Sequence, residues 1–178
     1  MYIIAIFLLM FTFFIYPSAF AIETAKAGVI PQKYVSVIMA GMDFVAFLGG
    51  LAFVTVKIAL GEKAKFLAPI LFCAGYLFLS LGNSWIGVIC GSVLIGFANG
   101  VGIPYIISSA SRKAGPDAAA TVMPLISMSM YFAQFVTPMV LSVVGSLFAW
   151  AQLPHLSYAA AFVSGAMFLL WSSCIKSE

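Results

Sequence analysis

Residues 34–60 read YVSVIMAGMDFVAFLGGLAFVTVKIAL, and the only charged residues in this stretch are Asp43 and Lys57. An α-helix needs roughly 17–25 apolar residues to cross the hydrocarbon core of a bilayer, so the stretch is long enough to span it. Lipid offers the backbone no hydrogen-bond partners, which favours a helix over an open strand. The stretch therefore predicts a transmembrane helix, and its length favours some tilt.

Similar apolar runs fill the rest of the chain. We predict further spans at residues 2–22, 66–82, 85–110, 119–148 and 158–174, which gives about six crossings. Of the 178 residues, 64% are hydrophobic and only 7% are charged, whereas soluble domains carry about 25% charged residues. The net charge of +3 is too small to favour nucleic-acid binding. We therefore predict an all-α fold, a six-helix bundle in one transmembrane domain over residues 1–178, with the lipid bilayer as its surroundings.

The basic residues predict how the bundle is oriented. One side of the predicted topology carries Lys57, Lys63, Lys65, Arg112, Lys113 and Lys176, and the other carries only Lys26 and Lys33. Because Lys and Arg are enriched in cytoplasmic loops, we expect both termini in the cytoplasm, in a plasma (inner) membrane. The first span also fits a cleavable signal peptide, since residues 19–21 (AFA) resemble a small-residue cleavage site. Cleavage would leave five spans and place the new N-terminus outside.

Small residues recur at four-residue spacing within the spans. The pairs are Ala46 with Gly50, Gly87 with Gly91, and Gly96 with Gly100. Helices in lipid approach closely only where side chains are small, so these pairs predict tight helix packing. The same pairs also fit helices that slide or bend against one another during transport.

Two stretches in the later spans resemble major facilitator transporters. Residues 91–104 (GSVLIGFANGVGIP) are similar to the glycine-rich tenth helix of that superfamily with its downstream proline. Residues 130–138 (MYFAQFVTP) resemble the Gln-Phe-x-Ser/Thr-Pro pattern in the eleventh helix of its drug-efflux-like branch. The resemblance covers nearly the whole chain and implies a C-terminal six-helix half, built from two inverted three-helix repeats at residues 1–82 and 83–178.

The resemblance also implies a function. It implies secondary active transport by alternating access, with a second six-helix half completing the cavity: an N-terminal half, a partner chain or another copy. Residues 57–65 (KIALGEKAK) depart from the family pattern, in which a Gly-x-x-x-Asp signature is followed by arginines. Here Glu62 follows Gly61 directly and the basic residues are lysines, so the resemblance does not extend to the gating network of that motif.

Asp43 is the most unusual residue of the spans. It lies about nine residues into its span, roughly 13 Å deep, near the middle of a bilayer. An acid at that depth is costly unless it faces the bundle interior or a wet cavity. Two functional roles fit: a protonation site that couples transport to a proton gradient, or a counter-ion for a cationic substrate. A protonated Asp43, hydrogen-bonded within the bundle, is the structural alternative.

Asn99 and Gln134 are the next polar side chains at depth. Each fits either a substrate-orienting role or a hydrogen bond between helices. Tyr16 and Tyr105, with other aromatic residues of the spans, fit either a cavity lining for lipophilic ligands or packing and interface anchoring. The scarcity of charge favours a small, lipophilic or cationic solute. Further residues at span ends or in loops are assigned no site role and include Glu23 and His155.

Two other classes of function fit the sequence less well. A substrate-capture subunit of an ATPase-driven vitamin importer also has about six spans and small-residue seams for docking a partner. An enzyme is not expected, because the spans offer no nucleophile motif, paired acids or metal cluster. The cysteines lie far apart, so neither a metal site nor a cofactor is predicted; they are Cys73, Cys90 and Cys174.

Overall fold

The computed structural model describes residues 1–81, 84–148, 150 and 155–174. Its helices are α1 (Tyr2–Ala27), α2 (Val35–Leu60), α3 (Ala64–Leu81), α4 (Trp85–Leu147) and α5 (Leu156–Cys174), with short 3-10 turns η1 (Gln32–Tyr34) and η2 (Gly61–Lys63). No strand occurs among these residues. The predicted all-α class is therefore confirmed.

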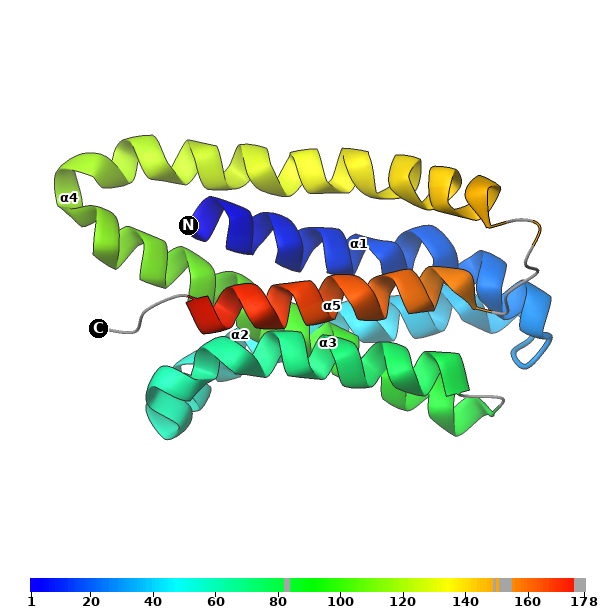
Figure 1. Ribbon diagram of the computed structural model, residues 1–178. Coiled ribbons are helices and arrows are strands. Elements are labelled where there is room, and N and C mark those ends of the chain that lie inside the picture. The colour runs from blue at the N-terminus through cyan, green and yellow to red at the C-terminus, as the bar shows by residue number, and fades with distance from the viewer. Residues whose placement is uncertain (82–83, 149, 151–154, 175–178) are drawn as a thin grey trace.

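Helix α4 consists of two limbs that fold back on each other. Gly115 has φ 73° and ψ 173°, outside the helical region, and Figure 1 shows the ribbon reversing its direction there. The first limb is Trp85–Gly115 and the second limb is Ala120–Leu147. The sequence predicted two spans separated by residues 111–118, whereas the helical segments nearly meet. One glycine suffices for the reversal because glycine adopts positive φ without steric penalty.

Successive helical segments run in opposite directions along the bundle. Figure 1 places the N-terminus, the end of α5, the η2 turn and the reversal of α4 at one end, and the connection from α1 to α2 with the end of α4 at the other. Gly61, with φ 52° and ψ −125°, ends α2 and lets the chain turn into α3. The predicted repeat boundary at residues 82–83 lies outside the described residues, as does Lys176.

Five segments of the described chain are long and apolar enough to cross a membrane, as the membrane prediction requires. They are Tyr2–Ala27, Gln32–Leu81, the two limbs of α4, and Leu156–Cys174. The segment Gln32–Leu81 contains both α2 and α3, which lie antiparallel to each other (Figure 1). Its 50 residues would measure roughly 75 Å as one straight helix, more than twice the thickness of a hydrocarbon core.

Helix α1 continues beyond the predicted end of its span at residue 22. Glu23 and Thr24 are buried in its last turns, and the Thr24 hydroxyl donates a hydrogen bond to the Phe20 carbonyl 2.7 Å away. Gly28, with φ 65°, terminates the helix in the left-handed conformation common at helix C-termini. The prediction ended the span at residue 22 and assigned Glu23 to the interface at the span end, whereas the helix continues to Ala27.

The core of the bundle lies around α1 and the first limb of α4. The buried residues of α1 cover a wide face of the helix rather than all of it, and they include Leu9, Tyr16 and Phe20. Residues of the first limb that pack against them include Ile95 and Ala98. By contrast, α2 buries only Val35, Met42 and Gly49. The bundle therefore has a well-covered centre and a helix, α2, that is largely bare.

Candidate functional site

Asp43 lies on the exposed side of α2. It follows Met42, which is buried against α4, and successive residues of a helix point about 100° apart. The neighbouring Phe44 and Phe47 are each 60% exposed, and their ring centroids lie 6.4 Å apart. A carboxyl group is thus exposed on an otherwise apolar helix face.

The contact between α2 and α4 depends on glycines. A Cβ atom at Gly96 would collide with the Met42 carbonyl, and one at Gly100 would collide with the Ala46 carbonyl. Close approach of two helices requires such small residues. The same holds between α3 and α4, where a Cβ at Gly91 would lie 2.8 Å from the Gly75 carbonyl oxygen. These contacts confirm the tight packing expected of the small residues in the first limb of α4.

Tyr16 is fully buried beneath this region. Its hydroxyl shares a 2.7 Å hydrogen bond with the Ser92 hydroxyl, which joins α1 to the first limb of α4. An ionised Asp43 would act electrostatically on Tyr16. The geometry therefore gives Tyr16 a packing role between helices and places it within the electrostatic range of Asp43.

Asn99 is 8% exposed and lies beside Gly100 in the first limb of α4. Its side-chain carbonyl oxygen has no hydrogen-bond partner among the described residues. A buried carbonyl without a donor costs about 1–3 kcal/mol. This unsatisfied acceptor next to the glycine contact is consistent with either of the roles predicted for Asn99.

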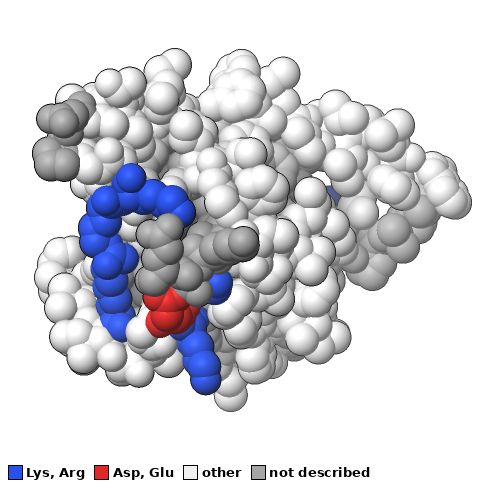
Figure 2. All heavy atoms as spheres, turned by 60° about the vertical axis from the view of Figure 1, so that its left-hand side comes forward, with Lys and Arg blue, Asp and Glu red and all other residues white. Residues whose placement is uncertain are grey.

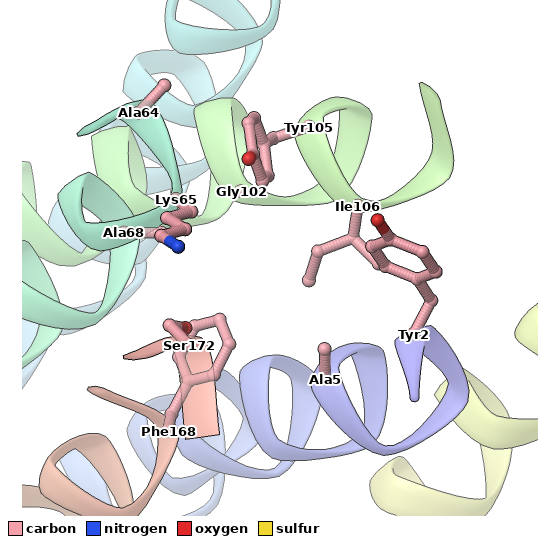
Figure 3. A pocket seen from close by; sticks show the side chains of 10 residues that line it. All are labelled: Tyr2, Ala5, Ala64, Lys65, Ala68, Gly102, Tyr105, Ile106, Phe168 and Ser172. Atoms are coloured by element: carbon pink, nitrogen blue, oxygen red, sulfur yellow. The ribbon is translucent and has the colours of Figure 1, made fainter. Parts of the chain in front are cut away.

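Tyr105 lies near the end of the bundle at which α1 begins. It lines a small cavity of about 10 Å³ together with Tyr2, Lys65 and Phe168. Figure 3 shows these side chains coming from four different helices and gathering around the same space. A cavity of that volume holds about one water molecule. This volume accommodates water rather than a solute, and the role predicted for Tyr105, cavity lining or packing, stays a prediction.

Basic side chains gather at this same end. Figure 2 shows them as a cluster with an acidic group among them, and we call it the basic end: Lys57, Lys63, Lys65, Arg112 and Lys113. The Lys57 ammonium donates a 3.3 Å hydrogen bond to the Ser108 hydroxyl, and the like charge of Arg112 acts on it electrostatically. Lys26, in the last turn of α1, and Lys33, in η1, lie at the opposite end.

Gln134 is exposed on the second limb of α4. Nearby, the fully buried Thr137 donates a 2.6 Å hydrogen bond to the Ala133 carbonyl. Tyr131, one turn earlier, is 72% exposed. The second limb therefore resembles α2, because it presents an exposed face that is mostly apolar.

A polar cluster that the sequence did not predict lies at the end opposite the basic end. Glu23, at the end of α1, is 5% exposed, and its carboxylate accepts a 2.9 Å hydrogen bond from the Ser157 hydroxyl of α5. The His155 Nδ1 atom lies 3.3 Å from the second carboxylate oxygen, at ion-pair distance although not in hydrogen-bond geometry. No sequence motif links Glu23 to Ser157 and His155, which lie more than 130 positions further along the chain.

A second, larger cavity than the one beside Tyr105 is apolar. It measures about 500 Å³ and lies between α1, the second limb of α4 and α5, lined by residues such as Phe11, Leu141 and Val163. The Ser164 hydroxyl at its wall already shares a 2.7 Å hydrogen bond with Thr12. Its lining therefore suits a lipophilic group and offers no free charged partner.

The predicted site residues do not meet in one place. Tyr16 and Asn99 are buried in the bundle, Asp43 and Gln134 are exposed on two different helices, and Tyr105 lies near the basic end. In the part of the chain that is described, no three His, Cys, Asp or Glu side chains are grouped so that they could hold a metal ion.

Comparison with known proteins gave no match: no family model, no curated protein and no solved structure is similar to this chain.

Proposed function

We propose that this chain is one half of a secondary active transporter. In this proposal six helical segments cross the membrane, both termini lie in the cytoplasm, and a second six-helix half completes the substrate pathway. The solute is small and lipophilic or cationic, and Asp43 carries the coupling proton or pairs with the cation. Asn99 and Gln134 orient the solute.

The exposed position of Asp43 is the observation that carries the proposal. Asp43 lies level with Gly96, which is eleven residues from the start of α4 at Trp85, roughly 17 Å along the helix axis. At such a depth an ionisable group on a lipid-facing surface is costly, and charged residues in spans almost always face a protein interior or water. An outer face that carries this acid is therefore expected to meet another protein surface or a wet cavity.

The distribution of exposed apolar surface supports a second half. Large hydrophobic residues are exposed along α2 and along the second limb of α4, and they include Phe47, Leu51, Phe132 and Phe135. These are also the helices that carry Asp43 and Gln134. In the proposal both helices border the shared cavity, while the central α1 and the first limb of α4 hold the half together.

The antiparallel arrangement and the basic end support the topology. Three helical segments up to Leu81 and three from Trp85 onward fit two three-helix repeats, the count that an inverted-repeat transporter has. The basic end carries Lys57, Lys63, Lys65, Arg112 and Lys113, and positive residues favour the cytoplasmic side. The N-terminus and the end of α5 lie at this same end (Figure 1).

The coupling chemistry follows from the charge of Asp43. When the carboxylate is ionised it attracts a cation or a proton from the cavity. When it is protonated its charge is removed, and the α2 face becomes apolar enough to repack against the opposite half. Alternation between these two forms would link proton binding to movement at the glycine contacts of Gly96 and Gly100.

A transport assay tests the proposal. The chain is produced in cells, and inside-out membrane vesicles are energised and given ethidium or tetraphenylphosphonium, two lipophilic cations. We expect accumulation that depends on the chain and collapses with a proton ionophore. Asp43→Asn should lower it at least about tenfold, an effect of at least about 1.4 kcal/mol, whereas the matched variant Glu62→Gln at the basic end should not.

Two outcomes would count against the proposal. Equal accumulation in vesicles with and without the chain would contradict transport of lipophilic cations. Chain-dependent accumulation that Asp43→Asn leaves unchanged would contradict the role of Asp43. If the chain instead purifies with ATPase subunits and accumulation requires ATP, the importer-subunit alternative would replace the proposal.

A further inference from the structure

We propose that Glu23, His155 and Ser157 form a proton-binding site at the end of the bundle opposite the basic end. This inference is independent of the proposed transport function, because it rests on the contacts between α1 and α5. In it a proton on His155 completes an ion pair with the buried Glu23 carboxylate, and loss of that proton leaves the carboxylate with Ser157 alone.

Glu23 is buried at the end of α1. Its side chain is 5% exposed, and a buried carboxylate needs hydrogen bonds or an opposite charge to remain ionised without a large penalty. Ser157 supplies one donor at 2.9 Å. A hydroxyl is a neutral donor, so the carboxylate charge still needs a cation, or the carboxyl group must itself take up a proton.

His155 is placed to provide that cation. Its Nδ1 atom lies 3.3 Å from Glu23 Oε2, and its ring is held parallel to the Tyr158 ring, with an interplanar angle of 10° and a centroid distance of 5.7 Å. The backbone at His155 has φ 55°, an uncommon conformation for a residue other than glycine. Ring stacking and backbone geometry thus fix the imidazole beside the carboxylate.

A small cavity gives a proton access to the pair. It measures about 10 Å³, the space of roughly one water molecule, and Glu23, Thr24, His155 and Tyr158 all line it. The remaining lining residues are apolar and come from the end of α1, the segment after it, α3 and α4: Ala27, Val29, Leu79 and Val88. A water molecule held there would touch polar groups only on the side of the proposed site.

The other titratable groups near the pair are tyrosines. Tyr158 of α5 stacks on His155, and its ring centroid lies 6.2 Å from that of Tyr76 of α3. Tyr16 of α1 also acts electrostatically on Tyr158. On the same helix as Glu23, Lys26 is exposed and lies three positions further on. Tyrosine hydroxyls are neutral between pH 5 and 8, a range in which imidazole ordinarily changes its charge.

The single histidine of the chain makes a direct test feasible. The full chain without a histidine tag is labelled at histidine and placed in nanodiscs, and the imidazole NMR signals are followed from pH 5 to 8.5. We expect Glu23→Gln, which keeps an acceptor for Ser157 but removes the negative charge beside the imidazole, to lower the midpoint of these signals. The control Glu62→Gln should leave the midpoint where it is in the wild type.

A second measurement applies even if Glu23→Gln does not fold. His155→Gln changes a loop residue, and its thermal unfolding is compared with that of the wild type at pH 6 and at pH 8.5. We expect the wild type to have the higher unfolding temperature at pH 6 and the difference to shrink at pH 8.5, because the ion pair requires the protonated imidazole. A midpoint that Glu23→Gln leaves unchanged, or a difference in unfolding temperature that does not depend on pH, would overturn the inference.

Discussion

Helices α1 and α2 have the same length and nearly the same apolar character, yet they lie in opposite surroundings. Each is 26 residues long. Helix α1 is buried along its length, with Leu9, Tyr16 and Phe20 packed in the core, whereas α2 has only three buried residues. Composition alone therefore does not decide which span is central.

The two helices differ in where they place polar groups. In α1 the polar side chains are satisfied internally: Thr12 shares a hydrogen bond with Ser164, and Tyr16 with Ser92. In α2 the acid Asp43 is exposed on the apolar outer face. A helix buried inside the bundle can satisfy its polar groups there, whereas an exposed acid requires something outside the chain. Under the proposed function, this contrast marks the α2 face as the side that meets the second half.

The largest expected effect comes from the glycine contact that attaches α2 to the core. Gly100→Ala places a methyl group against the Ala46 carbonyl, and overpacking of this kind costs about 1–3 kcal/mol. The matched control is Gly41→Ala on α2, where a Cβ meets nothing within 4 Å. We expect chemical unfolding in micelles to show a clear loss for Gly100→Ala and none for Gly41→Ala. Equal unfolding free energies for the two variants would show that the helices are not in close contact.

A smaller effect is expected from the hydrogen bond between α3 and α1. The Tyr76 hydroxyl donates to the Thr12 carbonyl at 2.5 Å, and both residues are fully buried. Tyr76→Phe should lower the unfolding free energy by about 1 kcal/mol. Tyr131→Phe is the matched change at a 72% exposed position and should have no effect. If both substitutions cost the same, the buried centre and the exposed face would not differ as described.

The smallest effect is expected at Gln134. Because its side chain is exposed on the second limb of α4, Gln134→Ala should change the unfolding free energy by less than about 0.5 kcal/mol. In the transport assay the same variant should weaken accumulation, since the proposal assigns Gln134 to the solute. A large loss of stability would instead make it a structural hydrogen-bonding residue.

The helical class and most helix positions were predictable because long apolar runs produce them directly. The predicted span 34–60 and the observed α2 at Val35–Leu60 differ by one residue. The burial of the end of α1 was not predictable in this way, because the partners of Glu23 there are Ser157 and His155. These partners come from the far end of the chain, and local pattern carries no information about them.

The candidate site was predictable only in part, for a similar reason. Depth along a span follows from sequence position, which is why Asp43 stood out. The side of the helix on which a residue lies depends on which neighbours pack against it. Thus Tyr16, for which the sequence left both cavity lining and packing open, is hydrogen-bonded to Ser92 in the core, whereas Asp43 is exposed.

The most direct test of the account asks whether the Asp43 face of α2 meets water. A variant with Asp43→Cys, in a background without Cys73, Cys90 and Cys174, is placed in membranes and exposed to a charged, membrane-impermeant thiol reagent. The control is Ile70→Cys on α3. Because Gly75 lies against Gly91 and α3 runs antiparallel to the first limb of α4, Ile70 lies level with Gly96 and therefore with Asp43.

Ile70 is also 51% exposed, so the two positions share depth and exposure and differ in the helix that carries them. We expect the Asp43→Cys variant to react at least about tenfold faster than the Ile70→Cys variant, because only the α2 face borders a wet cavity. Equally slow labelling of both would place Asp43 against lipid or in a dry contact and contradict the account of α2 as the wall of a solute pathway.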